Sequence, residues 1–144
     1  MAINTKKVVI GGIAAGVVLN VIDVISNMFF LGARMTAEAN AFKAGLGDQM
    51  KGASMVTYIV MNLILGLALV WTYAAVRPRF GPGLKTAAYV ALLFWILAGI
   101  FYSGYMQMGM MSSGLWWTFA FFGLVNFLIS GSVGAWLYAE DSVA

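Results

Sequence analysis

The chain has 144 residues, of which 62% are hydrophobic and 9% charged, whereas a soluble domain is typically about 45–50% apolar and about 25% charged. This excess of apolar residues is too large for one globular core, so the sequence predicts a single membrane domain, residues 1–144. The net charge is +3, but the basic residues stand in short joints between apolar runs, which argues against nucleic-acid binding. The absence of cysteine and histidine excludes thiol catalysis and histidine-ligated metal or haem on this chain.

Four segments are long and apolar enough to span a bilayer, which requires about 20 mostly apolar residues. Unpaired backbone is not tolerated in lipid, and strand alternation is absent, so these segments are predicted to be helices. The predicted fold is therefore all-α, a polytopic membrane protein with a four-helix transmembrane bundle. The predicted helices cover residues 8–32, 54–76, 86–108 and 115–138.

The first apolar run, residues 8–32, is also compatible with a signal peptide, because Lys6 and Lys7 precede it and residues 37–41 resemble a cleavage site. The apolar region of a signal peptide has only about 7–15 residues. The run in this chain is much longer and contains Asn20 and Asp23. We therefore expect a retained transmembrane helix.

The joints between the spans are short. In the first joint, residues 33–53, apolar side chains from Met35 to Leu46 fall on one helical stripe, which predicts an amphipathic helix at the membrane interface over residues 35–46. A flexible loop is the alternative. The second joint, residues 77–85, contains two prolines and two glycines and is expected to break the helix.

The distribution of basic residues predicts the orientation in the membrane, because Lys and Arg concentrate on the cytoplasmic side. The amino-terminal segment and the second joint together carry five basic residues, and the first and third joints carry three. Both termini are therefore predicted to lie in the cytoplasm, and a bacterial cytoplasmic membrane is the expected location.

Asp23 is the most informative residue, since it is the only charged residue in the first span. A carboxylate in hydrocarbon is costly and marks a candidate functional site. Asn20 and Asn27 share its helical face. Asn62 in the second span and Asn126 in the fourth lie on comparable polar stripes. We expect these five side chains to converge in a polar seam.

No Lys or Arg lies inside a span to pair with Asp23. A charged group without a partner in an apolar medium tends to become neutral. We therefore expect a neutral Asp23 that donates a hydrogen bond to an Asn carbonyl oxygen. Two roles remain open for it, a structural hydrogen-bonding group and a binding site for a proton or cation. Asn side chains also link membrane helices without any further role.

Small residues on the same helix faces predict close packing between helices, because they allow two backbones to approach. These residues are Gly12, Gly16, Gly66, Gly123, Ser130 and Gly134.

Met106, Met108, Met110 and Met111 cluster near the end of the third span. Thioethers are soft ligands that favour Cu(I), which makes this cluster a weak candidate metal site. Methionine also fills irregular gaps in cores, and this packing role is the one we expect. No catalytic set of side chains is present, so we expect neither an enzyme nor a bound cofactor.

Four short helices with one acidic residue in the first span resemble the plan of the small multidrug resistance transporters. That resemblance implies a bundle in which a proton and a cationic substrate compete for the acidic residue, here Asp23. The likeness ends at the plan. Asp23 stands where that family has a glutamate, the residues around it follow a different pattern, and the first joint is longer.

Three classes of function remain. The sequence favours a non-catalytic subunit or scaffold that packs in the lipid bilayer against other membrane proteins or against itself. The alternative is a proton-linked transporter of a small molecule or ion, centred on Asp23. The third class is a metal-handling protein that uses residues 106–111.

Overall fold

The structure, a computed structural model, describes residues 3–138. Four helices in this range are long and apolar enough to cross a membrane, and no strand occurs among the described residues. The prediction of an all-helical fold with four membrane-spanning helices is therefore confirmed. These helices cover Thr5–Phe42, Met55–Phe80, Leu84–Gln107 and Ser113–Leu137.

The first of these helices is composite. It consists of α1 (Thr5–Ser26), a π-helical turn η1 (Asn27–Leu31) and α2 (Gly32–Phe42), which follow one another without a break. The segment predicted as a separate interfacial helix over residues 35–46 is thus a continuation of the first span up to Phe42. The reason is that no strong helix breaker stands between η1 and Phe42.

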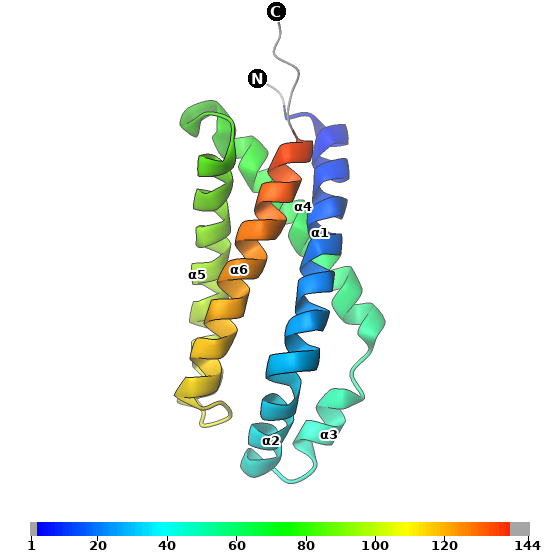
Figure 1. Cartoon of the computed structure of the whole chain (residues 1–144), viewed down its shortest axis with the longest axis vertical. Helices are drawn as coiled ribbons and strands as arrows, with labels where there is room; N and C mark the ends of the chain where they lie inside the picture. The colour runs from blue at the N-terminus through cyan, green and yellow to red at the C-terminus, as the bar shows by residue number, and fades with distance from the viewer. Residues whose placement is uncertain (1–2, 139–144) are drawn as a thin grey trace, which may run out of the picture.

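The chain reverses direction after α2. Gly45 adopts a φ of 81°, a conformation that favours glycine, and the short helix α3 (Leu46–Lys51) then runs back beside α2. The amide N–H of Gly47 donates to Asn40 Oδ1 at 2.8 Å and ties the two helices together. The first joint is therefore a small helical hairpin, as Figure 1 shows at the end of the molecule opposite the termini.

The second long helix, α4 (Met55–Phe80), includes Pro78 in its last turn. The predicted break therefore comes slightly later, at Gly81 and Gly83, whose φ angles are 85° and 115°. Proline removes only one backbone donor, and near a helix end that loss interrupts little of the hydrogen-bond ladder. Tyr73 supports the turn, since its hydroxyl oxygen accepts from the N–H of Gly83 at 3.0 Å.

The third and fourth long helices are α5 (Leu84–Gln107) and α6 (Ser113–Leu137). Helix α1 packs against both α4 and α6, and α6 packs in turn against α5 (Figure 1). The buried residues of α4 lie in its second half, and those of α5 lie in its first half. The two helices therefore pack together near the loop that connects them and diverge toward their other ends.

Glycines bring α1 and α4 into backbone contact. A Cβ added to Gly66 would overlap backbone atoms of Gly12 and Gly16, and a Cβ at Gly16 would lie 2.7 Å from Leu63 Cα. These close approaches agree with the packing role predicted for the three glycines. Gly123 differs, since its Cβ would meet only Trp95 Cδ1 at 3.7 Å, an ordinary contact.

Gly134 performs the same service between α1 and α6. A Cβ added there would overlap Val70 of α4 and lie 3.1 Å from Ala15 Cβ of α1. Large apolar side chains, among them Leu19 and Leu69, fill the space beyond these contacts and are almost completely buried. The core thus occupies the half of the bundle next to the termini.

Helix α2 is fastened to the start of α6. The two carboxylate oxygens of Glu38 accept hydrogen bonds from the N–H and the hydroxyl of Ser112, the residue that caps α6, at 2.6 and 2.7 Å. Arg34 Nη1 donates to Thr118 Oγ1 at 3.1 Å. A carboxylate at a helix N-terminus is favourable because the exposed N–H groups and the helix dipole attract negative charge.

Candidate functional site

Asp23 lies in the last turn of α1, directly before the π-helical turn. Its two carboxylate oxygens accept hydrogen bonds from two other helices. Oδ1 accepts from Asn126 Nδ2 of α6 at 2.7 Å, and Oδ2 accepts from Asn62 Nδ2 of α4 at 2.8 Å. The carboxylate therefore connects three of the four long helices at a single point.

Asn126 is itself held in place by two further contacts. Its Nδ2 also donates to the carbonyl oxygen of Leu19 at 3.2 Å, and its Oδ1 accepts from Ser130 Oγ at 3.1 Å. Asn126 and Ser130 are both buried. Ser130 was predicted as a packing residue, and in the structure it also extends the polar seam by one helical turn of α6.

Asn62 is held on the other side of the carboxylate. Its Nδ2 donates to Asn20 Oδ1 at 3.2 Å as well as to Asp23. Asn20 in turn donates to the carbonyl oxygens of Gly16 and Ile59, at 2.9 and 3.3 Å. The structure thus brings Asn20, Asp23, Asn62 and Asn126 together, four of the five side chains that were expected to converge.

Asn27 is the exception. Its side chain is exposed, and Nδ2 donates to the backbone carbonyl oxygen of Asp23 at 3.0 Å instead of to the carboxylate. The physical reason is its position at the first residue of η1, where the helix widens. The amide supplies a hydrogen bond to a backbone carbonyl group at this junction.

The direction of the hydrogen bonds also differs from the expectation for Asp23. A neutral carboxyl group donating to an Asn carbonyl oxygen was expected, whereas both oxygens accept from amide N–H groups. Acceptance at both oxygens suits an ionised carboxylate, which has no donor of its own. Such charge-assisted bonds are shorter and stronger than those between neutral groups.

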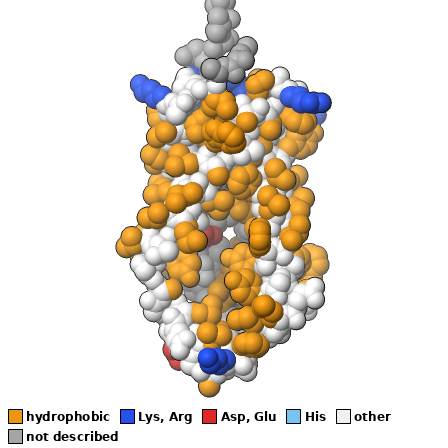
Figure 2. Space-filling view, turned by 180° about the vertical axis from the view of Figure 1, so that it is seen from behind, with side chains coloured by type: hydrophobic (Ala, Val, Ile, Leu, Met, Phe, Trp, Pro, Cys, Tyr) orange, Lys and Arg blue, Asp and Glu red, His pale blue; other side chains and the backbone are white. Residues whose placement is uncertain are grey.

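The Asp23 side chain is only half-buried. Figure 2 shows a hollow at mid-height on the rear face, with acidic oxygens at its wall, and Asp23 is the only acidic residue in the four long apolar helices apart from Glu38 at the far end of α2. The hollow lies on the side where α4 crosses behind α1 and α6 in Figure 1. The divergence of α4 from α5 leaves this approach open.

Tyrosines at the opening were not connected with Asp23 by sequence reasoning. Tyr102 of α5 lies within electrostatic range of the Asp23 carboxylate and of Tyr58 and Tyr105. The sequence places Tyr58 and Tyr102 on the polar stripes of their helices, but it does not show that the two helices diverge. That divergence is what exposes these side chains beside Asp23.

The four methionines do not form one site. Met110 and Met111 line a cavity of about 550 Å³ together with Glu38, and Met108 is largely exposed. Both oxygens of Glu38 are already engaged by Ser112. Within residues 3–138 no group of three or more acidic, Cys or His side chains is arranged to hold a metal ion.

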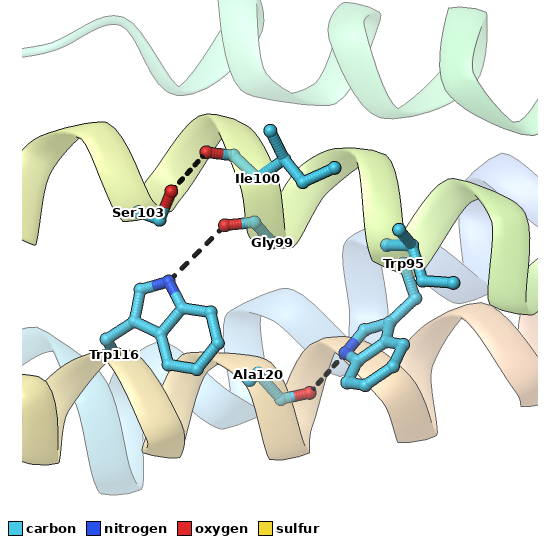
Figure 3. Close-up of a pocket in the computed structure, with 7 residues that line it drawn as sticks. Trp95, Gly99, Ile100, Ser103, Trp116 and Ala120 are labelled. Carbon is cyan, nitrogen blue, oxygen red and sulfur yellow. Dashed lines mark hydrogen bonds between the residues drawn. The ribbon is translucent and has the colours of Figure 1, made fainter.

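A second hollow, of about 250 Å³, lies along α5 and α6 and is almost entirely apolar. Figure 3 shows the two indole rings that border it: Trp95 Nε1 donates to the carbonyl oxygen of Ala120 at 2.7 Å, and Trp116 Nε1 donates to that of Gly99 at 3.4 Å. Because both ring donors are engaged, this hollow offers a ligand little beyond apolar contact. The polar cluster at Asp23 is therefore the stronger candidate site.

Comparison of the chain with protein-family models, with curated proteins and with solved structures finds no match. The fold alone does not define a function, because four-helix bundles carry many activities. Any functional conclusion therefore depends on the chemistry of the Asp23 cluster and on how it is reached.

Proposed function

We propose that this protein is a small proton-linked transporter or conduit of the membrane, with Asp23 as its proton-binding group. The open approach to the Asp23 carboxylate is the observation that supports this proposal most directly (Figure 2). An acid that serves only to join helices gains nothing from such an approach, because its hydrogen bonds are satisfied by the neighbouring helices.

The surroundings of Asp23 explain why a mobile partner is needed. An ionised carboxylate inside a membrane span is costly, and its charge is usually compensated by another charge. Asn62 and Asn126 offset part of that cost with two amide hydrogen bonds. No described Lys or Arg forms an ion pair with Asp23. In our proposal the compensating charge is a proton that binds to the carboxylate and leaves it again.

Proton flux into vesicles tests this function. The protein is reconstituted into liposomes that contain a pH-sensitive dye, and a potassium diffusion potential drives protons inward. We expect faster acidification with the wild-type protein than with Asp23→Asn. The matched control is Asp48→Asn, which removes an exposed acid of α3 and should leave the flux unchanged. Equal fluxes for the wild type, Asp23→Asn and protein-free vesicles would refute the proposal.

A non-catalytic subunit or scaffold is the second candidate function. It is supported by the start of α4, where every residue from 51 to 61 is exposed in the single chain. A partner membrane helix or a second copy of the chain would cover this segment. In a scaffold Asp23→Asn should be nearly silent, and a partner protein should remain bound during purification in mild detergent.

The orientation and location belong to the same proposal. We place both termini on the cytoplasmic side of a bacterial cytoplasmic membrane, on the strength of the basic residues at that end of the chain. In that orientation the hairpin of α2 and α3 lies outside the cytoplasm. Labelling of single cysteines introduced at residues 6 and 48 with a membrane-impermeant reagent tests this arrangement, because only the second should react in intact cells.

A further inference from the structure

Three tyrosines surround the opening that leads to Asp23. Tyr58 belongs to the first half of α4, and Tyr102 and Tyr105 belong to the second half of α5. All three side chains are exposed in the single chain. Tyr102 is the innermost of them in electrostatic terms, since it interacts with Asp23 as well as with both other hydroxyl groups.

The ring of Tyr102 is held in a fixed position. It stacks on Phe119 of α6, with ring centroids 5.5 Å apart and an angle of 18° between the planes. The Tyr105 ring lies one turn further along α5, with its centroid 6.0 Å from that of Tyr102. The two hydroxyl groups therefore follow one another from the end of α5 toward the level of Asp23.

These hydroxyl groups are not used within the described part of the fold. The hydroxyls of Tyr73 and Tyr138 each accept a backbone hydrogen bond, from Gly83 and from Asn4. In contrast, the hydroxyls of Tyr58, Tyr102 and Tyr105 form no hydrogen bond with any residue from 3 to 138. A tyrosine hydroxyl both donates and accepts, so these three groups remain available to water and to one another.

The opposite approach to Asp23 is closed. Buried apolar side chains, including Leu19, Leu69 and Phe127, fill the bundle between the carboxylate and the end that carries the termini. The backbones of α1 and α4 touch at Gly66 in the same region. Water therefore reaches the carboxylate from the side where α4 and α5 diverge.

We propose that the hydroxyls of Tyr105, Tyr102 and Tyr58, with water between them, form the route by which a proton reaches and leaves Asp23. Each hydroxyl accepts a proton from the water on one side and releases its own proton to the next acceptor, so the tyrosine stays neutral and one proton arrives on the carboxylate. The inference depends on the proposed function of Asp23 as a proton-binding group.

Few other groups face Asp23. From α4 only Tyr58 is titratable, and from α5 only Tyr102 and Tyr105. Helix α6 contributes Asn126 and Ser130, which do not titrate, and no described Lys or Arg of any helix forms an ion pair with the carboxylate. A change in the rate of protonation caused by a tyrosine variant is therefore not explained by a neighbouring charge.

Infrared spectroscopy after a rapid pH drop tests the route. The signal is the rise of the protonated carboxyl band that is present in the wild type and absent in Asp23→Asn. We expect Tyr102→Phe to slow this rise by at least about tenfold, because the ring and its stacking remain while the proton-relaying hydroxyl is lost. Tyr105→Phe should slow it as well.

The matched control is Tyr89→Phe. Tyr89 lies on the same helix and is also exposed, but it packs against Phe80 at the opposite end of the bundle. A wild-type rate in Tyr102→Phe, with the Asp23 band still present, would overturn the route and leave the proposed function intact. Absence of an Asp23-dependent band in the wild type would overturn both.

Discussion

The contact between α1 and α4 leads to a quantitative prediction for Gly66→Ala. The new methyl group would overlap the Gly12 carbonyl oxygen and the Gly16 amide nitrogen, and it would lie 2.7 Å from Gly16 Cα. These are backbone atoms, which cannot rotate away as a side chain would. An ordinary Cβ contact begins at 3.4 Å, so the two helices must separate locally by about 0.7 Å.

The expected cost follows from two opposing effects. Overpacking of a close contact costs about 1–3 kcal/mol, whereas alanine favours a helix over glycine by about 1 kcal/mol. Gly104→Ala is the matched control, because Gly104 lies inside α5 with nothing within 4 Å of an added Cβ. The free energy of unfolding of Gly66→Ala should therefore lie about 1–3 kcal/mol below that of Gly104→Ala.

Reversible unfolding in mixed micelles measures this difference. The denaturing detergent is increased stepwise, and helix content and tryptophan fluorescence are followed for both variants. The separation of α1 and α4 should also lengthen the 2.8 Å bond from Asn62 to Asp23. If the two alanine variants unfold at the same detergent fraction, α1 and α4 do not approach each other as closely as described.

Three further variants probe the hydrogen bonds. Asn126→Leu leaves Asp23 Oδ1 without its donor and should lower the free energy of unfolding by about 1–3 kcal/mol, measured in the same micelles; Asn27→Leu removes one exposed bond and should cost less, and the reverse order would contradict the seam. Glu38→Gln removes the charge at the α6 N-terminus and should speed amide hydrogen exchange in the first turn of α6; unchanged exchange would show that the contact with Ser112 is unimportant. Trp95→Phe deletes the 2.7 Å indole bond and should cost about 1 kcal/mol, and a neutral result would show that this bond adds no stability.

The four spans follow from the sequence because length and apolar composition decide whether a segment can cross a bilayer. The convergence of Asn20, Asp23, Asn62 and Asn126 also follows from helical periodicity, since polar groups in hydrocarbon turn toward one another. Periodicity assumes a regular helix, however. It places Asn27 on the same face as Asp23, and the π-helical turn that begins at Asn27 removes the basis of that assumption.

The approach to Asp23 is the part of the site that the sequence does not contain. It depends on the divergence of α4 from α5, which is a matter of tertiary packing between helices distant in the chain. No local pattern around Tyr58 or Tyr102 encodes that divergence. The same limitation applies to the bond between Glu38 and Ser112, which joins residues 74 positions apart.

The π-helical turn also divides the first long helix into two segments of different rotational phase. The N–H of Gly32 bonds to the carbonyl oxygen of Asn27, so this turn contains one residue more than an α-helical turn. Deleting one residue from 27–31 would restore the regular spiral and rotate everything beyond it by about 100°. Arg34 and Glu38 would then point away from α6. A single inserted residue therefore determines which way the outer part of this helix faces.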